Sequence, residues 1–197
     1  MRKTPRQTRS RQMVERIVAA GRAVLVTEGY DAFSTNRVAT TAGISPGSLY
    51  QYFPDKTAIL DVVIDHYWDE VTERVSASLA DRIGEVGTGM VRATADALVA
   101  ALEADRALLR VVAEELPHAR SRARRAALER RVRELVTTYL AARPEASRRP
   151  DPAVTAWVTV LAAENLAMRW VLDQPAQVSR EQLVEEMVAL VAGYLLG

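Results

Sequence analysis

The sequence of 197 residues contains no cysteine, and this absence narrows the chemistry open to the chain. Disulfide bonds, thiolate metal sites, iron–sulfur clusters and a cysteine nucleophile are all excluded. No run of about 18 apolar residues is present, so the sequence predicts no membrane-spanning helix. The basic start of the chain, MRKTPRQTRSRQ, is not followed by the apolar segment of a secretory signal. We therefore expect a cytoplasmic protein.

Groups and motifs typical of enzymes are also scarce. The chain has two histidines, His66 and His118, and they lie 52 residues apart. The nucleophile motif Gly-x-Ser-x-Gly, the zinc motif His-Glu-x-x-His and a dinucleotide-binding fingerprint are absent. Glu114 and Glu115 are adjacent and would point about 100° apart on a helix, so they cannot work as a close pair of acids. We expect no catalytic residue, no metal and no cofactor, and an α-helical enzyme is the weaker alternative.

The net charge of +1 conceals two oppositely charged parts. Residues 1–57 hold nine basic and four acidic side chains, a balance of +5, whereas the other 140 residues carry −4. Such an asymmetry indicates a polyanionic partner for the basic part.

The spacing of apolar residues is helical along most of the chain. They recur at intervals of three and four, and no stretch shows the alternation of a strand between hairpin turns. The sequence therefore predicts an all-α fold of about nine helices, with a head over residues 1–57 and a body over residues 58–197. The last two long helices are expected at about 152–173 and 179–196, after a proline-rich loop at 143–152.

Glycines indicate where the helices are interrupted. The first helix should end near Glu28, because Gly29 can adopt the left-handed conformation of a C-terminal cap. Residues 82–90 contain three glycines, each costing a helix about 1 kcal/mol relative to alanine, which predicts a link. A phosphate-binding loop is the alternative, but no strand precedes these glycines and the Lys-Ser/Thr pair is missing.

The segment from residue 34 to residue 60 has the pattern of a helix-turn-helix. A short apolar set at Val38, Ala39 and Ala42 ends at Gly43, and a second short helix follows. Neither helix would be stable alone, because isolated helices under about 12 residues are marginal in water. Two such helices joined at a glycine are typical of a helix-turn-helix.

The second helix of this pair offers groups suited to DNA. Ser45 can cap it and Pro46 fits its first position, while Asp55 can cap the helix that follows. The exposed residues of the second helix are small or form hydrogen bonds, as the N-terminal end of a helix in the major groove requires. They are Pro46, Gly47, Ser48, Gln51 and Tyr52. The hydroxyls of Tyr50 and Tyr52 can reach phosphates, and Lys56 adds a cation beside helix N–H groups.

These residues resemble the DNA-binding signature of TetR-type (tetracycline-repressor-like) bacterial regulators. The matching positions are Gly29-Tyr30, Ser34-Thr35, Val38-Ala39, Ala42-Gly43-Ile44-Ser45, Leu49-Tyr50, Tyr52-Phe53, Lys56 and Ile59-Leu60. Pro46 departs from the family pattern, in which a polar or basic residue is common.

The resemblance implies a homodimeric repressor that binds a palindromic operator. By similarity, the residues holding phosphates would be Thr35, Asn36, Arg37, Tyr50, Tyr52 and Lys56, and those nearest base edges would be Gly47, Ser48 and Gln51. The last two long helices would pair with their copies in a four-helix bundle. A ligand in the body would swing the fourth helix, spread the two heads and release the DNA.

Two further basic segments have more than one interpretation. Arg2, Lys3, Arg6, Arg9 and Arg11 could form an arm that enters the minor groove, or a solvated tail. Residues 118–133 hold seven arginines and could be a second nucleic-acid surface, but a solvated helix face with arginines paired to nearby acids is favoured.

A ligand site must lie in the body, and we expect a small, largely hydrophobic effector in an apolar pocket with a few polar groups. The candidates are polar or aromatic residues on apolar stripes: Tyr67, Trp68, Glu114, His118, Tyr139, Trp157, Asn165 and Met168. For each one, packing in the core or in an interface is the alternative. Asn165 stands out because a buried amide needs hydrogen-bond partners. A DNA-binding or architectural protein that needs no ligand is the remaining functional alternative.

Overall fold

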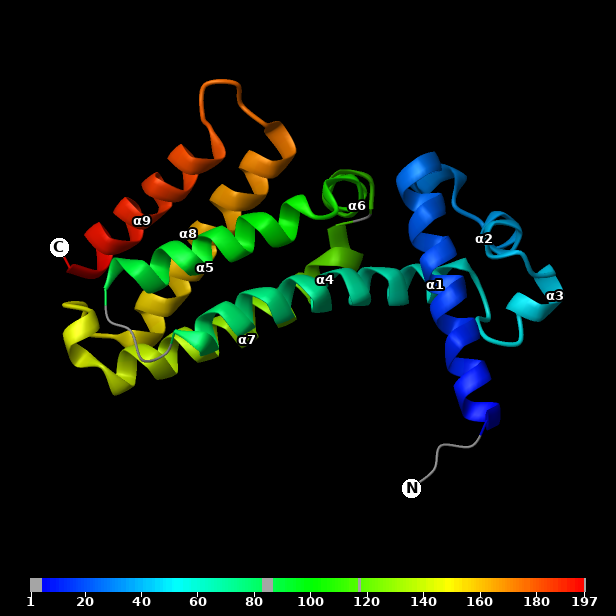
Figure 1. The fold of residues 1–197 in the computed structure, drawn as a ribbon, viewed down its shortest axis with the longest axis horizontal. Helices are drawn as coiled ribbons and strands as arrows, with labels where there is room; N and C mark the ends of the chain where they lie inside the picture. Colours follow the sequence, from blue (N-terminus) through cyan, green and yellow to red (C-terminus); the bar gives the residue numbers. More distant parts are fainter. Residues whose placement is uncertain (1–4, 83–86, 117, 197) are drawn as a thin grey trace. The chain divides into compact units, whose positions relative to one another are not determined.

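The computed structural model describes residues 5–82, 87–116 and 118–196, except for the side chains of residues 5–8, 118–124, 127 and 128. These residues form nine α-helices, one π-helical turn and one 3-10 turn, and they contain no strand (Figure 1). The all-α fold predicted from the spacing of apolar residues is therefore confirmed.

The helices follow one another with short connections. Their bounds are α1 Pro5–Ala32, α2 Thr35–Ala42, α3 Pro46–Leu49, α4 Lys56–Asp81, α5 Thr88–Glu103, α6 Arg106–Arg110, η1 Val111–Glu115, α7 His118–Ala142, η2 Pro144–Ala146, α8 Pro152–Asp173 and α9 Arg180–Leu196. The bounds of α8 and α9 confirm the two long helices predicted at the end of the chain. Within the predicted link at 82–90, residues 83–86 lie outside the described residues.

The chain divides into two compact units, and the first contains more than the N-terminal segment. It consists of Met1–Tyr67 together with Ala107–Ser121, and the second consists of Trp68–Arg106 and Arg122–Gly197. The π-helical turn η1 packs against α1 although some 80 residues of sequence separate them. The functional boundary at residue 57 stays a prediction.

Close packing around Gly21 holds the core of the first unit together. A Cβ at this position would lie 3.0 Å from Ile59 Cγ2 and 3.2 Å from Val63 Cγ2, so α1 and α4 approach each other where a side chain is missing. Phe33 and Leu49 are buried in the same unit. This close approach holds α1 against the first turns of α4. The segment with α2 and α3, which connects these two helices in the sequence, is therefore anchored at both ends.

The first helix differs from its predicted form at both ends. Gly29 has φ 77° and ψ 176°, which interrupts the helix without being the left-handed cap expected, and one further turn follows to Ala32. At the other end α1 begins at Pro5, so Arg6, Arg9 and Arg11 of the predicted arm belong to the helix. Residues 2 and 3 of the arm lie outside the described residues.

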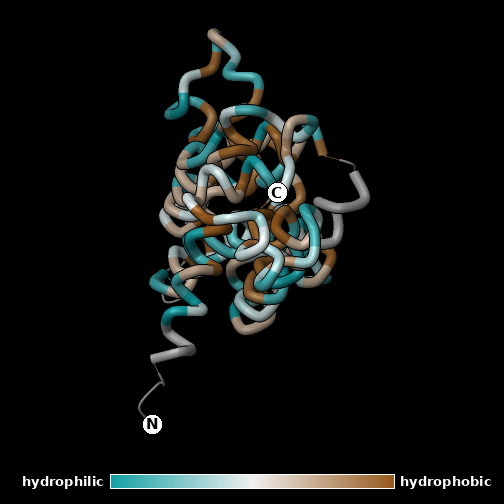
Figure 2. Tube along the Cα trace, turned by 90° about the vertical axis from the view of Figure 1, so that its right-hand side faces the viewer, coloured by the Kyte–Doolittle hydropathy of each residue, from teal (hydrophilic) through white to brown (hydrophobic). Residues whose placement is uncertain are grey.

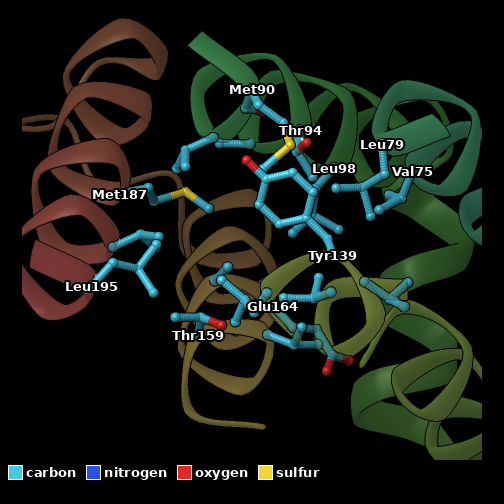
Figure 3. Close-up of a pocket in the computed structure, with 18 of the residues that line it drawn as sticks. Val75, Leu79, Met90, Thr94, Leu98, Tyr139, Thr159, Glu164, Met187 and Leu195 are labelled. Carbon is cyan, nitrogen blue, oxygen red and sulfur yellow. Dashed lines mark hydrogen bonds between the residues drawn. The ribbon is translucent and has the colours of Figure 1, made fainter. Parts of the chain in front are cut away.

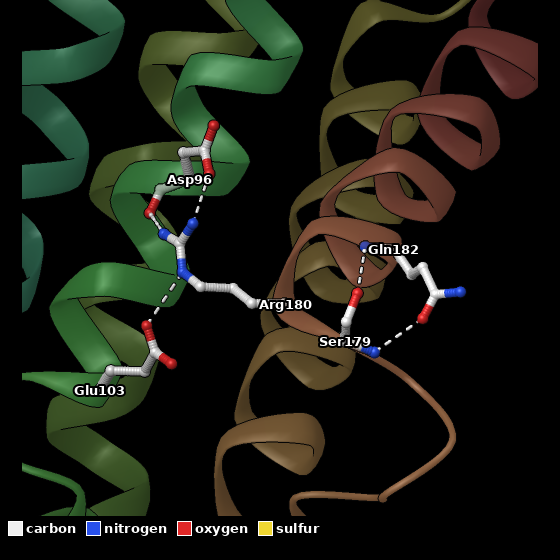
Figure 4. A network of polar contacts seen from close by, with 5 residues as sticks. All are labelled: Asp96, Glu103, Ser179, Arg180 and Gln182. Carbon is white, nitrogen blue, oxygen red and sulfur yellow. Dashed lines mark hydrogen bonds and ion pairs between the residues drawn. The ribbon is translucent and has the colours of Figure 1, made fainter.

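The second unit is a layer of helices in which α5 packs on α8 and α9. Arg180, at the start of α9, donates to Glu103 Oε2 at 3.0 Å and to Asp96 Oδ1 at 2.9 Å, so one guanidinium ties α9 to α5 (Figure 4). Ser179 and Gln182 form a reciprocal capping box at the same helix start (Figure 4). These contacts fix the direction in which α9 leaves the loop.

Hydrophobic and hydrophilic segments are interspersed along the helices (Figure 2), as is typical of amphipathic helices. Among the described residues, no helix has the length and apolar character needed to cross a membrane. Within the basic run at 118–133, two arginines form ion pairs with acids of other helices. Arg125 Nε lies 2.6 Å from Glu164 Oε1, and Arg131 Nη2 lies 3.9 Å from Glu73 Oε2. For these two arginines, the predicted pairing with nearby acids is confirmed.

Candidate nucleic-acid interface and ligand cavity

Local capping contacts build the helix-turn-helix. Ser34 caps α2 by accepting from the Arg37 N–H, and Ser45 caps α3 by accepting from the Ser48 N–H at 3.1 Å. Between the helices, Gly43 adopts the left-handed conformation (φ 64°, ψ 40°) and donates to Thr40 O at 3.0 Å. A residue with a Cβ would be strained in this conformation, and this explains a glycine at the turn.

The helical part of the recognition segment is shorter than expected. The α-helix ends at Leu49, and the following residues continue in a turn closed by the N–H of Gln51 on Ser48 O and of Tyr52 on Leu49 O. The side chain of Asp55 then caps α4 by accepting from the Ala58 N–H at 2.9 Å, as predicted. The ten predicted DNA-contact residues, none of which is buried, are Thr35, Asn36, Arg37, Pro46, Gly47, Ser48, Tyr50, Gln51, Tyr52 and Lys56.

Several of these side chains are held in place by neighbours in the first unit. The hydroxyls of Thr35 and Tyr50 lie 3.2 Å apart, so the start of α2 and the end of α3 present them together. Lys56 Nζ donates to Phe33 O at 3.4 Å and lies 5.7 Å from the centre of the Tyr30 ring. Such contacts reduce the freedom that each side chain would lose on binding a phosphate.

Two other predicted residues have internal partners that bear on their role. Arg37 forms an ion pair with Glu28, which partly neutralises its charge, but its side chain is exposed at the surface. The Ser48 hydroxyl lies 2.9 Å from that of Ser45. Gly47 differs from both, because a Cβ there would meet only Ser45 Oγ at 3.9 Å. The free protein therefore has no packing reason for a glycine at position 47.

One contact in the first unit joins segments that sequence reasoning did not connect. Glu115 Oε2 accepts from the Tyr30 N–H at 2.9 Å, across 85 residues of sequence. The same oxygen would lie 3.1 Å from a Cβ at Gly29. The glycine therefore leaves room for the carboxylate to satisfy the backbone where α1 is interrupted. No local pattern signals such a contact.

The second unit contains a partly open apolar cavity of about 130 Å³. Five helices contribute to its walls: α4, α5, α7, α8 and α9 (Figure 3). Most of the lining is aliphatic or methionine side chains, such as Leu79, Leu98 and Met187. The polar groups among the described lining residues are few: Thr94, Glu129, Tyr139, Thr159 and Glu164. Apolar walls with a small number of polar groups are typical of small-molecule sites.

Glu164 is the most unusual of these polar groups. Only 6% of this residue is exposed, and its Oε1 accepts from Arg125 Nε at 2.6 Å. Burial raises the pKa of Glu164 to about 7, against the opposing effect of Arg125 and with a further contribution from the nearby Glu129 carboxylate. Sequence analysis passed over Glu164 in favour of its neighbour Asn165.

The structure places the predicted ligand residues in different surroundings. Of those described, Tyr139 lines the cavity, whereas Tyr67, Trp68 and Met168 are buried outside its lining. Trp157 and Glu114 are exposed. The side chain of His118 lies outside the described residues.

In the single chain Asn165 is exposed, so it lies outside the core and the cavity, and its predicted contact with a ligand or a second copy stays a prediction. Its Nδ2 donates to Leu161 O at 2.8 Å, and Arg125 Nη2 donates to its Oδ1 at 3.4 Å. Leu161, one turn earlier, is itself only half-buried. The apolar stripe therefore marks a face of α8 that the single chain does not cover.

Two family models match this chain. One, described as bacterial regulatory proteins of the tetR family, matches residues 17–63. The other, described as the tetracyclin repressor-like C-terminal domain, matches residues 89–195, which are 107 of the 197 residues. The first match contains the helix-turn-helix, and the second contains most of the residues that line the cavity.

Solved structures share the fold over almost the whole chain. A TetR-family transcriptional regulator from Mesorhizobium loti is 21% identical, with a TM-score of 0.76 over 95% of this chain and 96% of that one. The fatty acid degradation regulator FadR from Bacillus halodurans is 17% identical, with a TM-score of 0.70 over 98% and 97%. FadR from Bacillus subtilis, solved in complex with stearoyl-CoA, is 14% identical, with a TM-score of 0.69 over 90% and 97%.

Curated proteins match over a shorter region. The nucleoid occlusion factor SlmA from Haemophilus influenzae is 35% identical over 51 residues, which are 26% of this chain and 23% of that protein. SlmA from Edwardsiella ictaluri is 28% identical over 74 residues, 38% of this chain and 37% of that protein. The match thus spans less than two fifths of the length of these curated relatives.

Proposed function

The chain belongs to the tetracycline-repressor-like family of DNA-binding transcriptional regulators, and on this premise we propose that it is a homodimeric repressor released from a palindromic operator by a small hydrophobic ligand. The observation that carries the proposal is that one chain contains both a helix-turn-helix and an apolar cavity. The helix-turn-helix belongs to the first unit, and the cavity belongs to the second.

The DNA-binding role is supported by the exposed residues of α2, α3 and the start of α4. The hydroxyls of Thr35 and Tyr50 and the ammonium of Lys56 are the proposed phosphate contacts, because hydroxyl and cationic groups bind phosphate oxygens. Gly47, Ser48 and Gln51 are the proposed contacts to base edges. Gln51 is exposed and can pair with adenine in the major groove.

The dimer is supported by apolar surface on the last two long helices. On α8, Val154 is 53% exposed and Trp157 is 50% exposed, and on α9 Leu190 is 50% exposed. Gly193 lies one turn beyond Leu190 and has open space around it, which permits a close approach of another helix. Contiguous exposed apolar side chains typically mark an interface, and a second copy of α8 and α9 would complete a four-helix bundle.

The ligand-dependent release is supported by the position of the cavity. Its walls include Val75 and Leu79 of α4, and the same helix begins at Lys56 beside the proposed phosphate contacts. The Bacillus subtilis neighbour, which has the same fold, was solved in complex with stearoyl-CoA, a ligand with a long apolar acyl chain and a polar, charged coenzyme A part. A ligand-independent DNA-binding protein is the alternative, suggested by the local similarity to SlmA.

Selection of duplexes from a random-sequence library by the full chain tests the proposal. We expect an inverted repeat, and we expect Lys56→Ala to weaken binding of all selected sequences alike and to reduce the salt slope by about 1. Arg131→Ala is the matched control, because Arg131 is exposed on α7 in the second unit. Selection of a sequence without two-fold symmetry would overturn the dimeric operator, and an unchanged Lys56→Ala variant would overturn the phosphate contact.

A further inference from the structure

One cation of the first unit lies directly at the turn of the helix-turn-helix. A Cβ on Gly43 would lie 2.8 Å from Arg16 Nη2, so the guanidinium of this α1 residue rests against the turn that joins α2 to α3. Two residues after the turn glycine, the hydroxyl of Ser45 lies 2.9 Å from that of Ser48, a proposed base contact. Arg16 therefore flanks the N-terminal end of α3, which is the end that faces the bases when such a helix lies in the major groove.

No described group neutralises this cation. The ion pairs and hydrogen bonds within the described part of the chain engage other arginines, such as Arg37 with Glu28, and none of them involves Arg16. Arg16 is also exposed to solvent. Its N–H donors are thus available to an external acceptor, and a guanidinium binds a phosphate group through two such donors at once.

The two ends of α2 are separated by about the width of a major groove. Thr35 begins the helix and Gly43 caps its end, eight residues later, which is about 12 Å at the rise of an α-helix. The major groove of B-DNA is also about 12 Å wide. The proposed phosphate contacts Thr35, Tyr50 and Lys56 gather at the first end of α2, whereas Arg16 lies at the other. Groups at the two ends are therefore spaced to meet the two strands that border one groove.

We propose that Arg16 binds a phosphate of the DNA strand that borders the major groove opposite the strand bound by Thr35, Tyr50 and Lys56. The α1 helix thereby becomes part of the DNA interface, and contacts to both strands hold α3 in the groove between them. The inference rests on the DNA-binding part of the proposed function, and it adds a contact outside α2, α3 and the start of α4.

Two further arginines of α1 differ in their position relative to Arg16. Residues seven apart in a helix are rotated by about 20° from each other, and residues five apart by about 140°. Arg9 therefore shares the face of Arg16, about 10 Å away along the helix axis, whereas Arg11 lies on another side of α1. Both residues are exposed. Arg9 extends the cationic face, and Arg11 provides a control on the same helix with the same charge.

The salt dependence of binding to a duplex of random sequence tests the phosphate contact in the full chain. Each phosphate that a protein neutralises adds about 0.9 to the slope of log affinity against log salt concentration. Between about 50 and 200 mM salt, the affinity of the unaltered chain should fall about 3–4-fold more, for each chain bound, than that of Arg16→Ala. Arg16→Lys keeps the charge and should retain the slope. Arg11→Ala should change the slope by less than half as much as Arg16→Ala.

The melting temperature separates a phosphate contact from a structural role at the turn. Because no described group pairs with Arg16, the Arg16→Ala variant should melt within about 2 °C of the unaltered chain. A larger drop in the melting temperature would assign Arg16 to the stability of the turn and overturn the inference. Weaker DNA binding with an unchanged slope would overturn it as well, and so would equal slopes in Arg16→Ala and Arg11→Ala.

Neutral phosphate substitutions locate the contact on the DNA. Single phosphates of a duplex selected by the unaltered chain are replaced by methylphosphonate, which carries no charge. For the unaltered chain, we expect weaker binding when a phosphate is replaced on either strand that borders the groove. Arg16→Ala should become insensitive to replacement on one strand, and Lys56→Ala on the other. If both variants become insensitive at the same phosphates, the contact to the opposite strand is overturned.

The two assays also distinguish this inference from the proposed function. Binding to a duplex of random sequence requires neither an inverted repeat nor a ligand, so the slope measurement decides the role of Arg16 even if no palindromic operator is selected. Failure to select such an operator would overturn the proposed dimeric repressor alone. A slope that is lowered by Lys56→Ala but unchanged by Arg16→Ala would overturn the contact by Arg16 and leave the proposed function intact.

Discussion

Replacement of Glu164 by glutamine should flatten the pH dependence of stability. The pKa of this carboxyl is raised from 4.5 to about 7 by burial, so the folded chain holds the proton more tightly than the unfolded chain does. Between these two values the folded state binds more protons, and the free energy of unfolding therefore falls as the pH rises. From pH 5 to pH 8 the two pKa values correspond to a loss of about 2–3 kcal/mol.

Chemical unfolding followed by tryptophan fluorescence measures this loss at both pH values and at one protein concentration. The unaltered chain should lose about 2–3 kcal/mol more than Glu164→Gln between pH 5 and pH 8. Glutamine keeps the shape of the side chain but cannot ionise, and titrating groups distant from Glu164 cancel in the difference. Glu73→Gln should lose as much as the unaltered chain, because Glu73 is exposed. An equal loss in Glu164→Gln would refute the raised pKa.

Substitutions at four further positions test the other parts of the molecule. Gly47→Ala should leave the melting temperature unchanged and weaken DNA binding, and an unchanged DNA affinity would remove position 47 from the interface. Gly21→Ala should instead cost about 1–3 kcal/mol of stability, because its Cβ would crowd α4. Trp157→Asp should raise the dimer dissociation constant at least about tenfold in sedimentation experiments, and a monomeric unaltered chain would contradict the bundle. Glu115→Ala should weaken ligand-induced release of DNA, because it removes the acceptor for the Tyr30 N–H. Glu115→Gln retains an acceptor and should release DNA normally. Equal release of DNA by both variants would exclude a role for this contact.

The helix-turn-helix could be predicted from the sequence because its determinants are local. The caps at Ser34, Ser45 and Asp55 each accept from an N–H group three residues away, and the turn between α2 and α3 depends only on the left-handed conformation of Gly43. Patterns of this kind are visible in a short window of sequence. The length of α3 was less predictable, because the turn after Leu49 differs from a helix only in its hydrogen-bond spacing.

An apolar pocket in the body could be predicted, but most of its lining residues could not, because five helices contribute to it and the surroundings of Glu164 are set by partners distant in the sequence. Glu164 and Arg125 are 39 residues apart, and only the packing of α7 against α8 brings them together. The exposure of Asn165 could not be predicted for the related reason that the stripe around it is apolar yet exposed in the single chain. Periodicity shows which face of a helix is apolar, but it does not distinguish a face that meets the core from one that meets another chain.

The division of the chain into two units indicates where a ligand could act on the head. Within the chain, α4 runs on from Tyr67 of the first unit to Trp68 of the second, and α7 continues from Ser121 to Arg122 in the same way. Both helices also line the cavity, α4 through Val75. A ligand that displaces these walls must move a helix whose other end belongs to the first unit, because a continuous helix transmits displacement along its axis. In the proposed repressor, these covalent connections would provide a route for ligand-induced release that depends on the rigidity of α4 and α7.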